Sequence, residues 1–303
     1  MKLKFVTTLF LASFITLQAN AQGCSDAGFC TAGALKGTNS NNQSSIALST
    51  AISSGENGTN IITPQLELKA PMGTKGYIEG KLPINIASGE AGSHTGIGDL
   101  IVTYTRPLAK KFALNGTVGT RVSFGDATAT DNNQPLPMPY QSNLGTTDLI
   151  VGVSAKWGKY ISTAIGYQQP LIQYNNNQYS LSSSTYNTYF ESANLERSGD
   201  ILFRVQGHYD WEKLGISAGP LFIYHLANDK ITYASGVNSS VAGSQGLTIN
   251  ITGNIYYKIR NWQVDISAGS PVQVRTARPD GLTKSWTVIP RLTYNFHKEI
   301  KKQ

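Results

Sequence analysis

The sequence predicts an all-β fold, a transmembrane antiparallel β-barrel of about 12 strands with short periplasmic turns and long outer loops. Three observations support this prediction. Apolar and polar residues alternate through most of the chain, the connections between the alternating segments are short and long in turn, and the final segment is itself a strand that ends in an aromatic residue, Phe296.

Composition and charge limit the class of protein. Only 14% of the 303 residues are charged, whereas about a quarter is usual in soluble domains, and 10% are aromatic. The formal net charge is +7, but Lys and Arg are spread among segment ends and form no basic cluster. We therefore expect no nucleic-acid partner.

The first 21 residues have the pattern of a secretory signal peptide. Lys2 and Lys4 precede an apolar stretch, and Ala19-Asn20-Ala21 forms a cleavage site, so the mature chain is expected to begin at Gln22. The apolar stretch is too short for a transmembrane anchor. The sequence thus predicts export, and in the rest of the chain no apolar stretch is long enough for a membrane helix.

Residues 22–44 are predicted to form an N-terminal periplasmic or luminal segment ahead of a barrel over 45–297 and a basic tail over 298–303. This segment holds the two cysteines of the chain, Cys24 and Cys30. In an exported protein a disulfide between them is expected. Two readings stay open: a simple staple, or a ring that enters the lower mouth of the barrel and partly occludes it.

Strands are read from the period of two. In "QGLTINITGNIYYKIRNW", Leu247, Ile249 and Ile251 fall on one face and Thr248, Asn250 and Thr252 on the other. Such segments begin near Ser45, Asn60, Gly76, Gly98, Lys111, Thr147, Lys159, Ser198, Lys213, Gln245, Asn261 and Thr283.

The connections separate a barrel from a soluble β-sandwich, which would also alternate. Tight turns such as "AKWGKYI" alternate along the chain with long polar segments at 87–97, 125–146, 171–196, 227–244 and 272–282. Aromatic residues gather beside the tight turns, as in an interfacial girdle: Trp157, Tyr160, Trp211, Tyr257 and Trp262. Long, regularly paired strands and this girdle favour the barrel.

An aspartate recurs at the head of three strands: Asp99 in "GIGDLIVTYTRPL", Asp148 in "TTDLIVGVSAKW" and Asp200 in "SGDILFRVQGHYDW". With apolar side chains outward, each acid points into the lumen near the outer mouth. Either these acids simply end a loop and start a strand, or they form a rim that attracts or sorts solutes.

The same register directs further charged side chains into the lumen. They are Glu67, Lys69, Glu79, Lys81, Arg121, Arg204, His208, Asp210, Asp265 and Arg291. Both signs are present in similar numbers, so the interior is either a salt-bridge network that fills a narrow barrel or a water-filled path between opposed charges. Twelve strands lie between the filled barrel of eight and the open channel of sixteen.

No catalytic, metal or cofactor site is expected. An outer-membrane lipid-hydrolysing enzyme would need a Ser–His pair facing lipid, and no histidine falls on that face in this register. Phosphate-loop and zinc spacings are also absent from the sequence.

Proline lies inside three strands, at Pro83, Pro220 and Pro290. Proline cannot donate to a sheet ladder, so each position should carry a bulge or a broken hydrogen bond. Either the bulge only adjusts curvature, or the wall opens sideways beside Gly219 and Pro220.

"GCSDAGFCTAG" after a signal peptide, followed by "GIGDLIVTYTRPL", resembles outer-membrane barrels of Bacteroidota, which are related to the putative meta-pathway phenol-degradation family and distantly to long-chain fatty-acid transporters. The segment from Gln22 to Ser44 is shorter than the plug of those transporters and lacks their Asn-Pro-Ala signature. The resemblance implies an outer-membrane channel or transporter, in a Gram-negative bacterium, for small solutes, apolar or aromatic ones among them. The partners would be outer-membrane lipid and the solute. The alternative is a non-conducting barrel whose loops, 125–146 and 171–196 above all, bind a partner or surface ligand.

Overall fold

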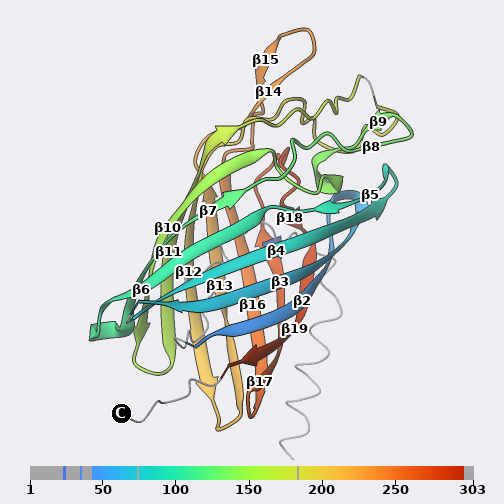
Figure 1. The fold of residues 1–303 in the computed structure, drawn as a ribbon. Helices are drawn as coiled ribbons and strands as arrows, with labels where there is room; N and C mark the ends of the chain where they lie inside the picture. The colour runs from blue at the N-terminus through green and yellow to red at the C-terminus, as the bar shows by residue number, and fades with distance from the viewer. Residues whose placement is uncertain (1–22, 25–34, 36–42, 74, 183, 297–303) are drawn as a thin grey trace, which may run out of the picture.

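The chain forms a closed antiparallel barrel of 12 strands (Figure 1). The computed structural model describes residues 23–24, 35, 43–73, 75–182 and 184–296. The barrel strands are β2 (Ser45–Ser54), β3 (Asn60–Met72), β4 (Gly76–Gly89), β6 (Leu100–Ala109), β7 (Leu114–Val122), β10 (Thr146–Trp157), β11 (Ile161–Gln173), β12 (Asp200–Asp210), β13 (Leu214–His225), β16 (Gly246–Ile259), β17 (Trp262–Gln273) and β19 (Trp286–Asn295). Consecutive barrel strands pair with one another, and β19 pairs with β2 from Asn295↔Ser45 to Trp286↔Ser54, which closes the barrel.

The predicted fold class is confirmed, and every barrel strand begins close to its expected position. The prediction of a loop over residues 87–97 is wrong. There β4 continues to Gly89 and pairs with β5 (Gly92–Ile97) in a hairpin. Gly92 turns the chain at a φ of 129°, a conformation open to glycine. The ladder then passes from β5 to β6 at Gly98, whose N–H donates to the carbonyl of Pro83 at 2.9 Å.

The outer wall of the barrel carries an apolar surface. Large side chains such as Leu48, Ile165 and Ile266 are at least half exposed there, while their polar neighbours along each strand face inward. A monomer in water rarely exposes so many large apolar side chains on one continuous surface. The wall is therefore built to face lipid.

The end with the tight turns carries aromatic pairs that bridge neighbouring strands or turns. Phe112 in η4 (Lys111–Ala113) lies 4.6 Å from Trp157 between ring centroids, and Trp262 lies 4.9 Å from Tyr294. Tyr209 near the end of β12 and Trp211 in the turn that follows are 4.5 Å apart between ring centroids. These pairs form the girdle expected at a membrane interface.

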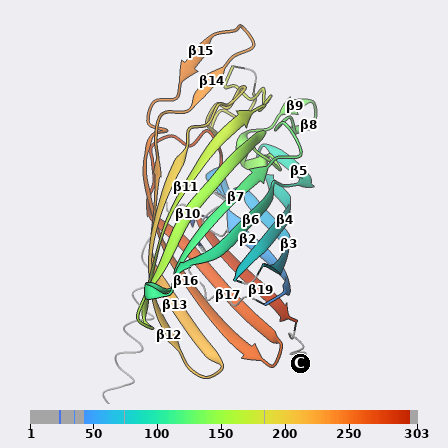
Figure 2. The ribbon, with the colours of Figure 1, turned by 60° about the vertical axis from the view of Figure 1, so that its left-hand side comes forward.

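Long loops fold over the opposite end of the barrel (Figures 1 and 2). We call them the lid, residues 123–145, 174–182, 184–199, 226–245 and 274–285. The lid contains the hairpins β8 (Thr130–Asp131) with β9 (Gln134–Pro135) and β14 (Lys230–Thr232) with β15 (Asn238–Ser240), the helical turn η5 (Met138–Tyr140), and β18 (Thr283–Lys284). At the same end, η3 (Glu56–Gly58) joins β2 to β3.

Two small hydrophobic cores hold the lid together. One is built around Tyr140, Tyr179 and Tyr189, and the other around Met138, Leu195 and Ile231. Loops that only hung in solvent would lack such cores, so the lid is a packed structure. In the part of the chain that the structure describes, no helix has the length and apolar character needed to cross a membrane.

Candidate functional site in the lumen and its lid

A buried network of charges joins the lid to the barrel wall. Its centre is Arg197 in the lid, which contacts Asp200 on β12 at 3.1 Å and Asp280 in the lid at 3.3 Å. Arg275 contacts the same Asp280 at 2.5 Å and Asp229 at 3.6 Å. Charges removed from water in this way are stable only when paired, so the network fixes three lid segments against the wall.

His225, the last residue of β13, lies between two carboxylates of this network. Its Nδ1 is 2.7 Å from Asp200 Oδ1, and its Nε2 is 2.7 Å from Asp229 Oδ1. Ionised carboxylates only accept hydrogen bonds, so this position between two of them favours the imidazolium form of the ring, which can donate from both nitrogens.

Asp280 is held in its charged form by the arginines. Burial raises the pKa of its carboxyl, but Arg275 and Arg197 beside it outweigh burial and bring the pKa below the ordinary value of 3.8. The pKa of Arg197 is in turn raised, since Asp280, Asp200 and Asp148 outweigh its own desolvation. Both partners therefore stay ionised at neutral pH.

Charged side chains of the wall outside the lid network are paired as well. Asp99 on the β5–β6 connection accepts from Arg121 Nε at 2.6 Å and from Ser123 Oγ at 2.7 Å. Arg291 Nη2 on β19 donates to Glu67 Oε1 at 2.9 Å. The first pair links the β5–β6 connection to β7, and the second reaches from β19 across β2 to β3, so the interior adds contacts to those of the sheet ladder.

An apolar ring lies inside the barrel, and the N-terminal segment reaches it. Leu35, fully buried, packs against inward side chains of five strands: Ile101, Ile150, Ala164, Leu202 and Leu221. Arg204 on β12 donates to the carbonyl of Leu35. Leu35 thus occupies part of the lumen at this level.

This ring gives the recurring aspartates a structural context. Ile101, Ile150 and Leu202 each follow one of the three acids by two residues, so each shares the acid's inward face. Every copy of the repeat places a carboxylate near the outer mouth and an apolar side chain one step deeper. The acids themselves are buried, Asp99 paired with Arg121 and Asp148 and Asp200 beside Arg197.

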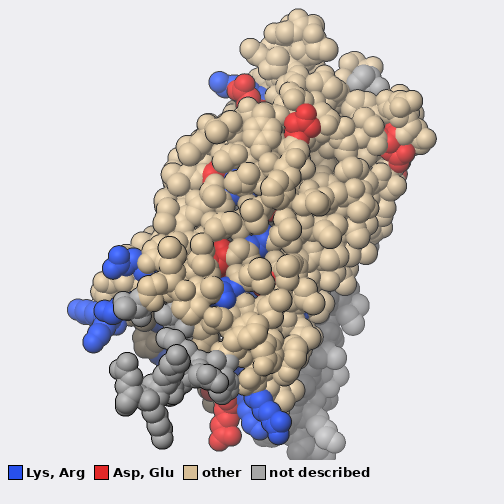
Figure 3. Space-filling view, viewed as in Figure 1, with Lys and Arg blue, Asp and Glu red and all other residues tan. Residues whose placement is uncertain are grey.

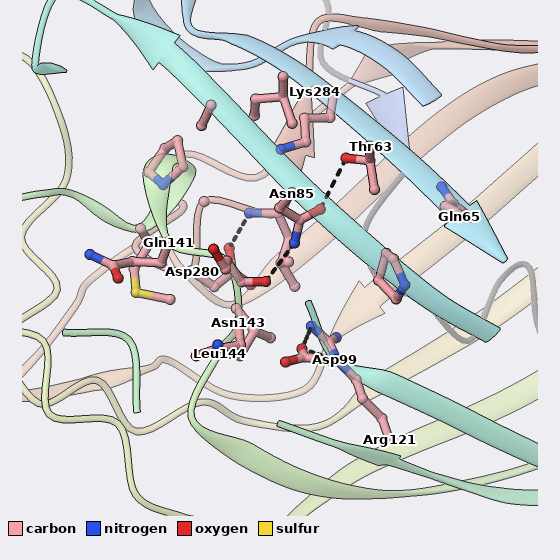
Figure 4. A pocket seen from close by; sticks show the side chains of 18 of the residues that line it. Thr63, Gln65, Asn85, Asp99, Arg121, Gln141, Asn143, Leu144, Asp280 and Lys284 are labelled. Carbon is pink, nitrogen blue, oxygen red and sulfur yellow. Dashed lines mark hydrogen bonds and ion pairs between the residues drawn. The ribbon is translucent and has the colours of Figure 1, made fainter. Parts of the chain in front are cut away.

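A small cavity remains between the wall and the lid (Figure 4). Its volume is about 70 Å³, and Thr63, Asn85, Asp99, Asp280 and Lys284 are among its lining residues. Thr63 Oγ1 donates to Asn85 Oδ1 at 3.0 Å, and Asn85 Nδ2 donates to the carbonyl of Ser142 at 2.5 Å. A dry cavity that takes benzene measures about 150 Å³, so this space suits a few waters or a very small polar solute.

The structure places the predicted lumen residues as follows. Asp148 and Asp200 come together in the lid network, and Asp99 meets Arg121. Asp265 accepts from Gln263 at 2.8 Å, and His208 Nε2 lies 2.6 Å from Ser162 Oγ. No carboxylate among the described residues orients the other nitrogen of His208 by a hydrogen bond, as a catalytic triad requires.

The predicted disulfide between Cys24 and Cys30 falls partly outside the described residues. Gly23–Cys24 forms β1, whose backbone pairs with Lys284 and Thr283 of β18, but Cys30 lies outside the described residues.

Sequence reasoning missed Arg197, Arg275 and Asp280, because loop residues carry no periodicity. It also missed the role of Leu35, although a large aliphatic residue in a mostly polar segment was a signal.

The strand pairing is interrupted at Pro220. Arg204↔Leu221 and Gly207↔Ala218 pair between β12 and β13, while the two positions between them do not, and the register does not shift. On the other side, β13 pairs with β16 without a break, Pro220 opposite Ile251. At this point the wall has a broken ladder rather than a bulge.

Comparisons with known proteins agree with the fold. An outer-membrane channel from Pseudomonas putida F1 superposes with a TM-score of 0.56 at 15% identity, covering 85% of this chain and 97% of that one. The CymD monoaromatic hydrocarbon channel gives 0.46 at 9% identity over 92% and 95% of the two chains, and the KdgM porin gives 0.43 at 10% over 84% and 99%. No family model and no curated protein matches the sequence. The superposition on the Pseudomonas putida channel shows that the chain shares the fold of that outer-membrane barrel.

Proposed function

We propose that the protein is an outer-membrane channel for small solutes in a Gram-negative bacterium, and not an enzyme. The observation that carries this proposal is a closed barrel with a lipid-facing apolar wall, whose charged interior leads to a cavity beneath a lid. Ion pairs in a lumen can exchange partners with water and a passing solute, whereas a fully apolar core cannot.

Planar-bilayer conductance and liposome swelling test this proposal. The folded barrel should give small, discrete conductance steps, and liposomes containing it should swell in small uncharged solutes. Conductance no higher than that of protein-free bilayers, together with no swelling, would overturn the channel.

The second candidate is a non-conducting barrel whose lid binds a partner or surface ligand. It is favoured by the ion pairs that hold the lid to the wall, by the buried position of Leu35 in the lumen, and by the small volume, about 70 Å³, of the cavity described above. A ligand retained by the purified barrel in the absence of any conductance would favour this candidate.

We extend the proposal to the N-terminal region. Residues 1–21 are removed on export, Cys24 and Cys30 form a disulfide, and residues 22–44 partly occlude the lumen. The buried position of Leu35 and the pairing of β1 with β18 support the last of these.

The solute class is proposed from the resemblance to phenol-degradation and fatty-acid barrels of Bacteroidota and their relatives: small molecules, apolar or aromatic ones among them. An apolar solute would leave sideways beside Gly219 and Pro220, where the ladder between β12 and β13 is broken. Pro220→Ala is assayed with one apolar and one polar solute. Selective loss of apolar uptake supports the side exit, and equal uptake of both removes it.

A further inference from the structure

A trough runs along the outer wall between β6 and β11, and its cause can be read from the strand register. One row across four strands reads Tyr104, Val118, Val151 and Tyr167. The next row towards the tight turns reads Arg106, Gly116, Val153 and Ile165. In both rows long side chains on the outer strands flank short ones on β7 and β10, so the surface is hollowed between them.

The hollow has the size and chemistry of a ligand site. Its volume is about 490 Å³, within the range of roughly 300–1,000 Å³ typical of small-molecule pockets. Gly152 and Gly166, paired in the β10–β11 ladder, form part of its floor. Leu108, at an irregularity after Pro107, bounds the hollow beside Gly116: a Cβ at Gly116 would lie 3.0 Å from the Leu108 side chain.

The one charged side chain in the hollow is Arg106, which is exposed on the lipid-facing wall and makes no ion pair with another described residue. Arg106 lies four residues before Lys110, where the tight turn begins. Four residues of a tilted strand rise about 10 Å, which puts the guanidinium near the boundary between headgroups and acyl chains. The Phe112–Trp157 pair marks the interface just beyond it.

The surroundings favour an anionic group at this level. In Figure 3, Lys and Arg atoms project at the lower left, where Figure 1 labels β6. Tight turns face the periplasm in this class of barrel, and the periplasmic leaflet consists of phospholipid. A phosphate on Arg106 would make a charge-assisted contact, while an acyl chain would extend along the trough towards Tyr104 and Tyr167.

We propose that this trough binds one phospholipid of the periplasmic leaflet, with its phosphate on Arg106 and one acyl chain over Gly116 and the short side chains of β7 and β10. The proposal rests on the orientation of the barrel and is independent of which solute the lumen admits. It adds a lipid site to the outside of the wall, whereas the lid network faces the lumen.

The test is lipid retention measured by native mass spectrometry. The purified barrel in detergent is mixed with phosphatidylglycerol, phosphatidylethanolamine, diacylglycerol or lipid A. The wild type should retain one molecule of phosphatidylglycerol or phosphatidylethanolamine and should retain neither diacylglycerol nor lipid A. Gly116→Leu, which fills the trough, and Arg106→Gln, which removes the charge, should each lower retention about tenfold.

Matched controls are Gly253→Leu and Arg260→Gln. Gly253 is an outward glycine on β16 with no side chain within 4 Å of its Cβ position, and Arg260 lies in the tight turn after β16. Both controls should retain phospholipid like the wild type. Val153→Trp fills the trough from β10, should Gly116→Leu fail to show the heat-modifiable gel migration of a folded barrel. Unchanged retention in the folded trough variants, or retention of lipid A in place of phospholipid, would overturn the proposal.

Discussion

Asp280 is the residue on which Arg197 and Arg275 of the lid converge. In Asp280→Asn, Arg197 and Arg275 lose their shared carboxylate while staying buried, and breaking a buried ion pair costs about 3–5 kcal/mol. We expect the lid to loosen while the barrel stays folded. Hydrogen exchange should show faster exchange in residues 274–285 and unchanged protection in the strands.

Asp126→Asn is the control for this variant, because among the described residues the Asp126 carboxylate accepts hydrogen bonds from the neutral side chains of Thr128 and Asn176 at the lid surface. It should leave lid exchange as in the wild type. Equal exchange in all three proteins would show that Asp280 does not hold the lid.

The same residue predicts how the lid responds to acid. The pKa of Asp280 is lowered on folding, so its contribution to stability is present above the unfolded value of about 3.8 and is lost as the pH falls through the folded one. Lid protection measured by proteolysis should therefore hold from pH 7 to about 4 and fall only below that. Glu56 has the opposite effect on stability as the pH falls, because burial outweighs the attraction of Arg278 and raises the pKa of its carboxyl. Loosening between pH 7 and 5 would contradict the prediction.

At the scale of elements, alternation predicted the barrel strands because each has one face in lipid and one in the lumen. It failed where that environment ends. The β4–β5 hairpin continues beyond the barrel wall, and the lid is held by contacts between residues far apart in sequence, such as Arg197 and Asp280. The sequence did not predict that Ile101, Ile150 and Leu202 point inward, because their neighbours along the strand are apolar too. Only the position of Leu35 shows what they pack against.

The N-terminal segment is predicted to limit conductance. Leu35 fills the apolar ring of the lumen, and Arg204 holds its carbonyl. Deleting residues 22–36 should raise single-channel conductance, and Leu35→Asp should do so to a smaller degree, because a carboxylate is poorly stabilised in the apolar ring. Removal of residues 298–303 serves as the control and should change nothing. An unchanged conductance in a correctly folded deletion variant would leave the segment only a structural role.

For the whole molecule, the wall defines how the barrel sits in a bilayer. Trp157, Trp211 and Trp262 lie at the tight-turn end, and Trp286 begins β19 at the lid end, opposite Ser54. The 10 residues of β19, tilted as in other membrane barrels, span about 25 Å, close to the height of the apolar band of such barrels. The four tryptophans should therefore mark two interfaces on either side of a hydrocarbon layer.

This arrangement predicts a depth profile for quenching by lipids. In proteins that keep one tryptophan and carry Phe at the other three positions, bromine atoms near the headgroups should quench each tryptophan more strongly than bromine atoms at the bilayer centre, since all four indoles lie at strand ends. Phe203, on the lipid-facing wall and 5.9 Å from Phe222 across the β12–β13 pair, offers the matched position: Phe203→Trp in a tryptophan-free barrel should show the reverse order. Absence of lipid quenching at all five positions, together with recovery of the protein as a soluble periplasmic species, would show that the barrel does not reside in a membrane.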